Sequence, residues 1–167
     1  MTITSKKQMA HFNKLPLSAT VNLPLDREIY SHVIEMYISA TAPKLSKEID
    51  LSIEMNPQQR FVADVLMLAN LSRSSGVSAD ENWQSQIIMA GINVLYLESE
   101  RLDKRGDLES RKLSGQCMLS CASLCKSAQF ILVDGQTKAL VRAIQRDALN
   151  SARCKSSGDI ARLIRYK

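Results

Sequence analysis

Hydrophobic residues recur at helical spacing through most of the chain, but in one short segment they alternate with polar residues. Residues 19–24 read Ala-Thr-Val-Asn-Leu-Pro. Successive side chains of a strand face opposite ways, so the apolar ones would pack inward while Thr20 and Asn22 face outward together. The alternation therefore predicts a short strand with one polar face free to contact a partner.

Two short helices are predicted to follow this strand. The first spans Asp26 to Ser39, with Asp26 as its N-cap and Glu28 in its electropositive first turn. The Ala-Pro pair at 42–43 ends it, and a second helix is expected to begin near Ser46. A strand and two helices within about forty residues bury too little apolar surface to be stable alone, so we expect the chain to dimerise.

Three longer helices are predicted between residues 57 and 128. They cover 58–72 after Pro57, then 82–104, and finally the segment from Asp107, which we expect to be its N-cap, to Ala128. The middle one is apolar on nearly every side in its first half, so it requires packing partners all round. We interpret it as the centre of a helical bundle or of an oligomer interface.

Two short motifs in the N-terminal third carry a family resemblance. They are Thr-Val-Asn-Leu-Pro-Leu at 20–25 and Leu-Ser-Lys-Glu-Ile at 45–49. With them, residues 19–55 resemble a ribbon-helix-helix DNA-binding unit of the kind found in regulators carried by conjugative plasmids. In that family, strands of two copies pair as a ribbon in the DNA major groove, and a Ser at the start of the second helix meets phosphate. The resemblance implies that Thr20 and Asn22 contact base edges and that Ser46 and Lys47 hold phosphate.

The C-terminal segment, residues 129–167, repeats the order of strand, helix and helix in its sequence pattern. Residues 129–133 are β-prone, 137–152 have apolar residues at helical spacing, and the run from Ser156 to Asp159 can cap a last helix. Two interpretations of this second copy stay open. It is itself the DNA-binding unit, or it pairs with residues 19–55 as a single-chain pseudo-dimer.

Charge is distributed unevenly and favours a polyanionic partner. Residues 126–167 hold nine Lys or Arg against three Asp, a net +6, whereas the first 125 residues hold 13 basic against 14 acidic residues, a net −1. Basic side chains neutralise phosphates and release counterions, so they bind nucleic acid in a salt-dependent way. The other interpretation of this charge is a solvated helical face. The basic residues expected to contact phosphate are Arg142, Arg146, Arg153, Lys155, Arg162 and Arg165, together with Lys6, Lys7 and Lys14 of the polar arm at 1–17.

Neither a metal site nor a catalytic centre is expected. Cys117, Cys121 and Cys125 recur every four residues, so on a helix they span about 12 Å and cannot gather tightly round zinc. We expect them to be small buried hydrophobic residues. His11 and His32 sit in no metal-ligand or nucleophile-base spacing, and the chain lacks GxGxxG and GxxxxGK[ST] phosphate-binding loops. No enzyme activity and no cofactor are therefore expected.

The hydropathy pattern predicts a cytoplasmic protein. No apolar run reaches the length needed to cross a bilayer, and residues 1–17 lack the hydrophobic centre of a signal peptide. We therefore expect no contact with a membrane, and reduced thiols.

These patterns together predict a mainly α fold with a short β-ribbon, in which a ribbon-helix-helix unit is joined to a helical bundle and the protein is dimeric. The predicted divisions are an arm at 1–17, the ribbon-helix-helix-like unit at 18–56, a helical body for oligomerisation at 57–128 and the basic segment at 129–167. The predicted function is sequence-specific binding of double-stranded DNA to regulate transcription. Activation is preferred because the helical body gives room to contact RNA polymerase. Two other classes stay open: an all-helical adaptor or inhibitor from a mobile element whose basic tail meets a protein or RNA, and a component of a structural assembly.

Overall fold

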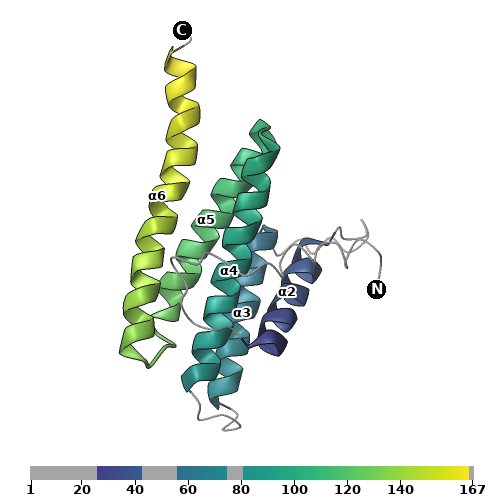
Figure 1. Ribbon diagram of the computed structural model, residues 1–167, viewed down its shortest axis with the longest axis vertical. Coiled ribbons are helices and arrows are strands. Elements are labelled where there is room, and N and C mark those ends of the chain that lie inside the picture. The colour runs from purple at the N-terminus through teal and green to yellow at the C-terminus, as the bar shows by residue number, and fades with distance from the viewer. Residues whose placement is uncertain (1–25, 43–55, 75–80, 166–167) are drawn as a thin grey trace.

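Five helices make up the described part of the molecule, and no strand occurs within it (Figure 1). The computed structural model describes residues 26–42, 56–74 and 81–165, with side chains for 26–42, 56–71 and 83–155. The helices are α2 (Arg27–Thr41), α3 (Pro57–Ser74), α4 (Glu81–Arg105), α5 (Leu108–Ala128) and α6 (Gly135–Arg165). The mainly helical class is confirmed for these ranges. The candidate strand at 19–24 and the short helix expected from Ser46 lie outside them.

Polar side chains fix where the helices begin. At α2 the Asp26 carboxylate accepts hydrogen bonds from the backbone N–H groups of Glu28 and Ile29, at 2.9 and 3.1 Å. These bonds satisfy donors that have no partner inside the helix, so the first turn forms at that residue. The same role falls to Asn56 at α3, Asp107 at α5 and Asp134 at α6. The predicted caps Asp26 and Asp107 are thus confirmed.

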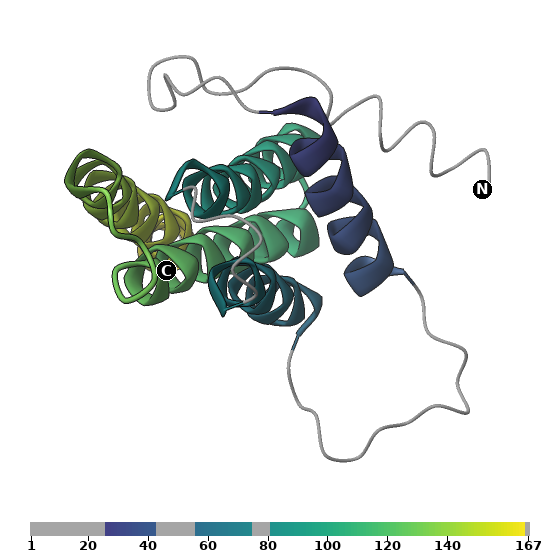
Figure 2. The same cartoon turned by 90° about the horizontal axis from the view of Figure 1, so that it is seen from below.

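Helix α4 occupies the centre of the packing. Every described side chain from Gln84 to Ser99 is buried, apart from the half-buried Tyr96. Helices α2, α3 and α5 pack directly against α4. Helix α6 packs mainly against α5 and bonds to α4 along one edge. Seen along the bundle, α2 and α6 lie on opposite sides of the other three helices (Figure 2). The prediction that this apolar helix is surrounded by partners is confirmed within the monomer.

Aromatic and small side chains shape the contacts of α2 and α3 with α4. Tyr37 of α2 meets Phe61 of α3 edge to face, with ring centroids 5.0 Å apart, a favourable geometry for two aromatic rings. Both side chains are fully buried. The Tyr37 hydroxyl donates to the buried Glu98 carboxylate of α4 at 3.0 Å, and Arg101 forms an ion pair with that carboxylate. This carboxylate is therefore buried together with its partners rather than alone.

The C-terminal segment does not have the strand-helix-helix order expected from its sequence. Residues 129–133 form the turn between α5 and α6, where the N–H groups of Ile131 and Leu132 both donate to the carbonyl of Ala128. The two predicted helices are one continuous helix, α6, which passes through Ser156 to Asp159 without a break. The predicted strand and the predicted helix start are therefore wrong. Buried Ile131 and Leu132 explain the first error, since the apolar residues that resemble a strand close the end of the core.

The close approach of α4 to α3 and α5 depends on Gly91. A Cβ placed there would lie 3.0 Å from Leu124 Cδ2 and 3.1 Å from Val65 Cγ1. These distances leave no room for a branched side chain unless the helices move apart.

We predict that Gly91→Val lowers the free energy of unfolding by about 1–3 kcal/mol through overpacking. Gly115→Ala on α5 is the matched control, because the nearest atom to its new Cβ is 4.0 Å away; it should gain about 0.5–1 kcal/mol from helix propensity. Urea unfolding measures both changes. Equal midpoints for Gly91→Val and the wild type would show that the three helices do not pack this closely.

Candidate nucleic-acid interface

Helix α6 has one buried side and one basic side. The side that faces the bundle carries small and branched apolar residues, namely Val141, Ile144, Ala148 and Ala152. The solvent side carries exposed or half-exposed basic residues at positions 138, 142, 146 and 153. We call these four residues, Lys138, Arg142, Arg146 and Arg153, the basic stripe.

The basic stripe follows helical geometry. Steps of four, four and seven residues keep successive side chains within about 40° of one line along the helix. From Lys138 to Arg153 the stripe spans about 22 Å at 1.5 Å per residue. Asp147, the one acidic residue of α6 before Lys155, lies on a different side and bonds to Tyr96. The stripe is therefore a continuous line of positive charge without a carboxylate in it.

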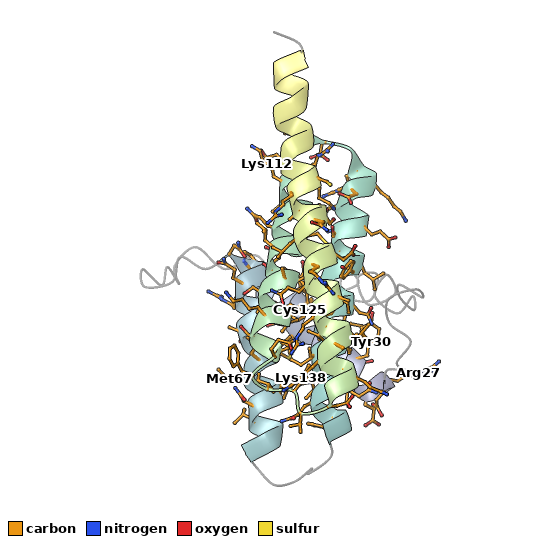
Figure 3. The ribbon with its side chains drawn as sticks, turned by 90° about the vertical axis from the view of Figure 1, so that its left-hand side faces the viewer. Arg27, Tyr30, Met67, Lys112, Cys125 and Lys138 are labelled. Carbon is orange, nitrogen blue, oxygen red and sulfur yellow. The ribbon has the colours of Figure 1, made fainter. Side chains whose placement is uncertain are left out.

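Contacts within the protein hold one end of the stripe without neutralising it. Arg142 Nε donates to the Gln129 side-chain oxygen at 3.1 Å, and the Gln129 amide donates to the backbone carbonyl of Lys138 at 3.2 Å. Gln129 is uncharged, so both cations keep their full charge. Within the part of the chain that the structure describes, no residue of the stripe forms an ion pair. Figure 3 looks onto the side of the molecule formed by α5 and α6, with Lys138 near its lower end and Lys112 near its upper end.

Lys155 is placed differently from the basic residues with which it was grouped. Its ammonium donates to Ser99 Oγ at 2.9 Å, to Ser114 Oγ at 2.7 Å and to the Asp103 carboxylate at 2.8 Å. These bonds use all three of its protons, and only 15% of the side chain is exposed. Lys155 therefore fastens α6 to α4 and α5 and is not available to a phosphate.

Two further polar contacts set the rotation of α6 about its own axis. The Tyr96 hydroxyl of α4 donates to Asp147 at 2.8 Å, and Ser85 of α4 lies 3.5 Å from the Thr137 hydroxyl. Burial and the bond to Asp147 both raise the pKa of Tyr96, so the phenol stays protonated as the donor. With Lys155, these contacts lie along the edge of α6 that faces α4. They turn the basic stripe toward solvent.

The remaining predicted site residues are distributed as follows. Arg142, Arg146 and Arg153 lie together on the stripe, while Arg162 and Arg165 belong to α6 but their side chains are not among those described. Thr20, Asn22, Ser46, Lys47, Lys6, Lys7 and Lys14 lie outside the described residues. Lys138 was missing from the predicted contacts, although its four-residue spacing from Arg142 was visible in the sequence.

The three regularly spaced cysteines of α5 have the buried environment that was expected for them. Cys117, Cys121 and Cys125 are free and buried, and Cys154 is free and exposed. Burial raises the pKa of the Cys117 thiol to about 12, which keeps it protonated and unreactive. His32 lies exposed on α2. Among the residues that the structure describes, no group of His, Cys, Asp and Glu is arranged to hold a metal ion.

Comparison with known proteins adds no family to this description. Neither protein-family models, nor curated protein sequences, nor solved structures match the chain. The resemblance of residues 19–55 to the ribbon-helix-helix family thus stays a prediction. None of the described helices combines the length and the apolar character that crossing a membrane requires.

We predict that Lys155→Met lowers the free energy of unfolding by about 1–3 kcal/mol, because it removes a charged donor from a buried polar cluster. Arg153→Met on the exposed side of the same helix should change it by less than about 0.5 kcal/mol. Urea unfolding of both variants measures the difference. If the two variants unfolded at the same urea concentration, Lys155 would not fasten α6.

A second prediction concerns thiol accessibility. With Ellman's reagent at pH 8, one of the four thiols of the native protein should react rapidly, and Cys154→Ser should abolish that phase. The three buried thiols should react only after unfolding in denaturant. Rapid reaction of any thiol in the native Cys154→Ser variant would contradict the packing of α5.

Proposed function

We propose that the protein is a double-stranded-DNA-binding regulator of transcription in which the basic stripe of α6 holds the phosphate backbone. The observation that supports this proposal is the stripe itself, a line of three exposed cations and the half-exposed Lys138, with no acidic residue in it. Phosphate contacts by Lys and Arg supply most of the sequence-independent affinity of DNA-binding proteins. A solvated helix surface more often alternates the two signs of charge, as the sequence of α4 does near its end.

The geometry of the stripe suits a regular polyanion. The phosphates of one DNA strand recur every 3.4 Å or so along the helix axis, so a stripe about 22 Å long runs past several of them. Four phosphate contacts would give a slope of roughly −3.6 for log K against log salt. The ties of α6 to α4 and α5 hold the four cations in place before DNA arrives, which reduces the entropy lost on binding.

Sequence reading is assigned in this proposal to the N-terminal residues. The resemblance to ribbon-helix-helix regulators supports a role for Thr20 and Asn22 at base edges and for Ser46 and Lys47 at phosphate, in a dimer whose two strands pair. Asn can bond to adenine, and the Thr methyl can contact thymine. The stripe would then add affinity on the flanks of the site that the ribbon contacts.

We predict that Arg146→Gln weakens binding to every duplex to a similar extent and reduces the salt slope by about one unit. The measurement is fluorescence anisotropy of a labelled random-sequence duplex between 50 and 200 mM salt. Over this range, the affinity of a protein that makes six phosphate contacts falls by about 10³-fold or more, so a change in slope is easily measured. Arg105→Gln is the matched control, since it makes the same charge change in the last turn of α4. It should leave the slope unchanged.

Two results would contradict the proposal. If adding the protein at low salt leaves the anisotropy of the duplex unchanged, the result would favour an adaptor whose basic end binds a protein. Equal losses in Arg146→Gln and Arg105→Gln would show that net charge alone attracts the DNA and that the stripe is not the contact surface.

A further inference from the structure

A groove with a volume of about 400 Å³ runs between α3 and α5, away from the basic stripe. Val62, Ala63 and Leu66 of α3 and Leu119 of α5 supply its apolar surface. Uncharged side chains, including Gln116 and Ser123, make up the rest of the lining. Its volume lies within the range of pockets that hold a ligand or the side chains of a partner.

The apolar surface of this groove lacks a covering element within the described part of the chain. Leu119 is 54% exposed at the centre of the outer face of α5. On neighbouring α3, Met67 and Leu71 are also exposed, and Figure 3 shows Met67 at the edge of the molecule. Leu66 and Leu68 of α3 are partly buried against the core. Clustered exposed apolar residues of this kind mark interaction sites.

A lysine lies beyond each end of the groove on α5, and Glu109 lies one turn before the first of them. Lys112 precedes Gln116 by four residues, and Lys126 follows Ser123 by three, so each continues the same helix face by about one turn. Both lysines are exposed. Since the lining itself is uncharged, the surface presents an apolar centre between two cations that are about 21 Å apart along the helix.

We propose that the α3–α5 groove binds an amphipathic helix of a protein partner, one that carries a ridge of apolar side chains with acidic residues at both ends. An apolar ridge at positions i, i+3 or i+4, and i+7 is how helices dock into such grooves. Carboxylates placed about one turn beyond each end of the ridge would meet Lys112 and Lys126. The groove is separate from the basic stripe, so this proposal does not depend on DNA binding.

Charge argues against the two other occupants. A second copy docked by a two-fold axis through Leu119 would bring Lys112 of each protomer opposite Lys126 of the other, and like charges so placed repel. A nucleic acid could bind the two lysines through its phosphates. Its charged backbone would then lie over Leu119 and Leu66, and this contact would bury no apolar surface of the partner. An acidic amphipathic helix satisfies both features at once.

The test uses two synthetic labelled peptides and the full chain. One peptide is an Ala-based helix with Leu at i, i+3 and i+7 and Glu flanking the ridge at both ends; the other has Lys in place of Glu. Fluorescence anisotropy should show binding of the Glu peptide at micromolar concentration and binding of the Lys peptide weaker by about tenfold or more. The double variant Lys112→Glu/Lys126→Glu should reverse this preference.

Substitution within the groove tests its location. Leu119→Asp should weaken binding of the Glu peptide by about tenfold or more. Val133→Asp is the matched control, because Val133 is similarly exposed but lies in the turn after α5, and it should leave binding unchanged. Urea unfolding confirms that both variants fold.

Four results would overturn the proposal. They are no binding of the Glu peptide, equal binding of both peptides, equal effects of the two aspartate variants, and a dimer in sedimentation that Leu119→Asp dissociates. The last of these would assign the groove to a second copy of the chain.

Discussion

The burial of α4 is the constraint on which the rest of the molecule depends. Its side chains from Gln84 to Ser99 are apolar or uncharged on every side of the helix, except for Glu98. Exposing any side of this helix to water would lose much of the hydrophobic stabilisation, so other helices must cover it all round. Helices α2, α3 and α5 meet this requirement directly. Gly91 lets α3 and α5 approach α4 closely. The Tyr37 hydroxyl and Arg101 bond to the Glu98 carboxylate, which is buried on α4.

Polar contacts with α4 determine which side of α6 faces solvent. Its apolar side packs on α5, while Thr137, Asp147 and Lys155 bond to α4 along one edge. Apolar packing is non-directional, so it places α6 without fixing its rotation; hydrogen bonds at stated atoms fix the rotation. The charged and the apolar surfaces are separated as a result, with the basic stripe on α6 and the groove beside α5. In our two proposals, the basic stripe binds a polyanion and the groove binds a protein helix.

Local chemistry explains which parts of this structure could be predicted from the sequence. Asp26 and Asp107 are recognisable caps because they act on the N–H groups that follow them, and the helical spacing of apolar residues located α3 to α5. Residues 129–133 were misjudged because their β-prone side chains close the core from a turn, a tertiary role that propensity does not contain. The run from Ser156 to Asp159 has residues that can cap a helix, but in the structure it lies within the continuous helix α6. The hydrogen bonds of Lys155 go to Ser99 and Ser114, which are far away in the sequence, so charge alone could not distinguish its environment from that of Arg153.

We propose that the outer face of α6 is the surface that contacts DNA. Titrating the isotopically labelled protein with a random-sequence duplex at low salt, and following backbone amide shifts by NMR, tests that claim residue by residue. We expect shifts along the four residues of the basic stripe, and little change at Lys155 and at Ser99, Ser114 and Asp103, to whose side chains it bonds. Shifts confined to α2 and α3, with the stripe unmoved, would contradict it.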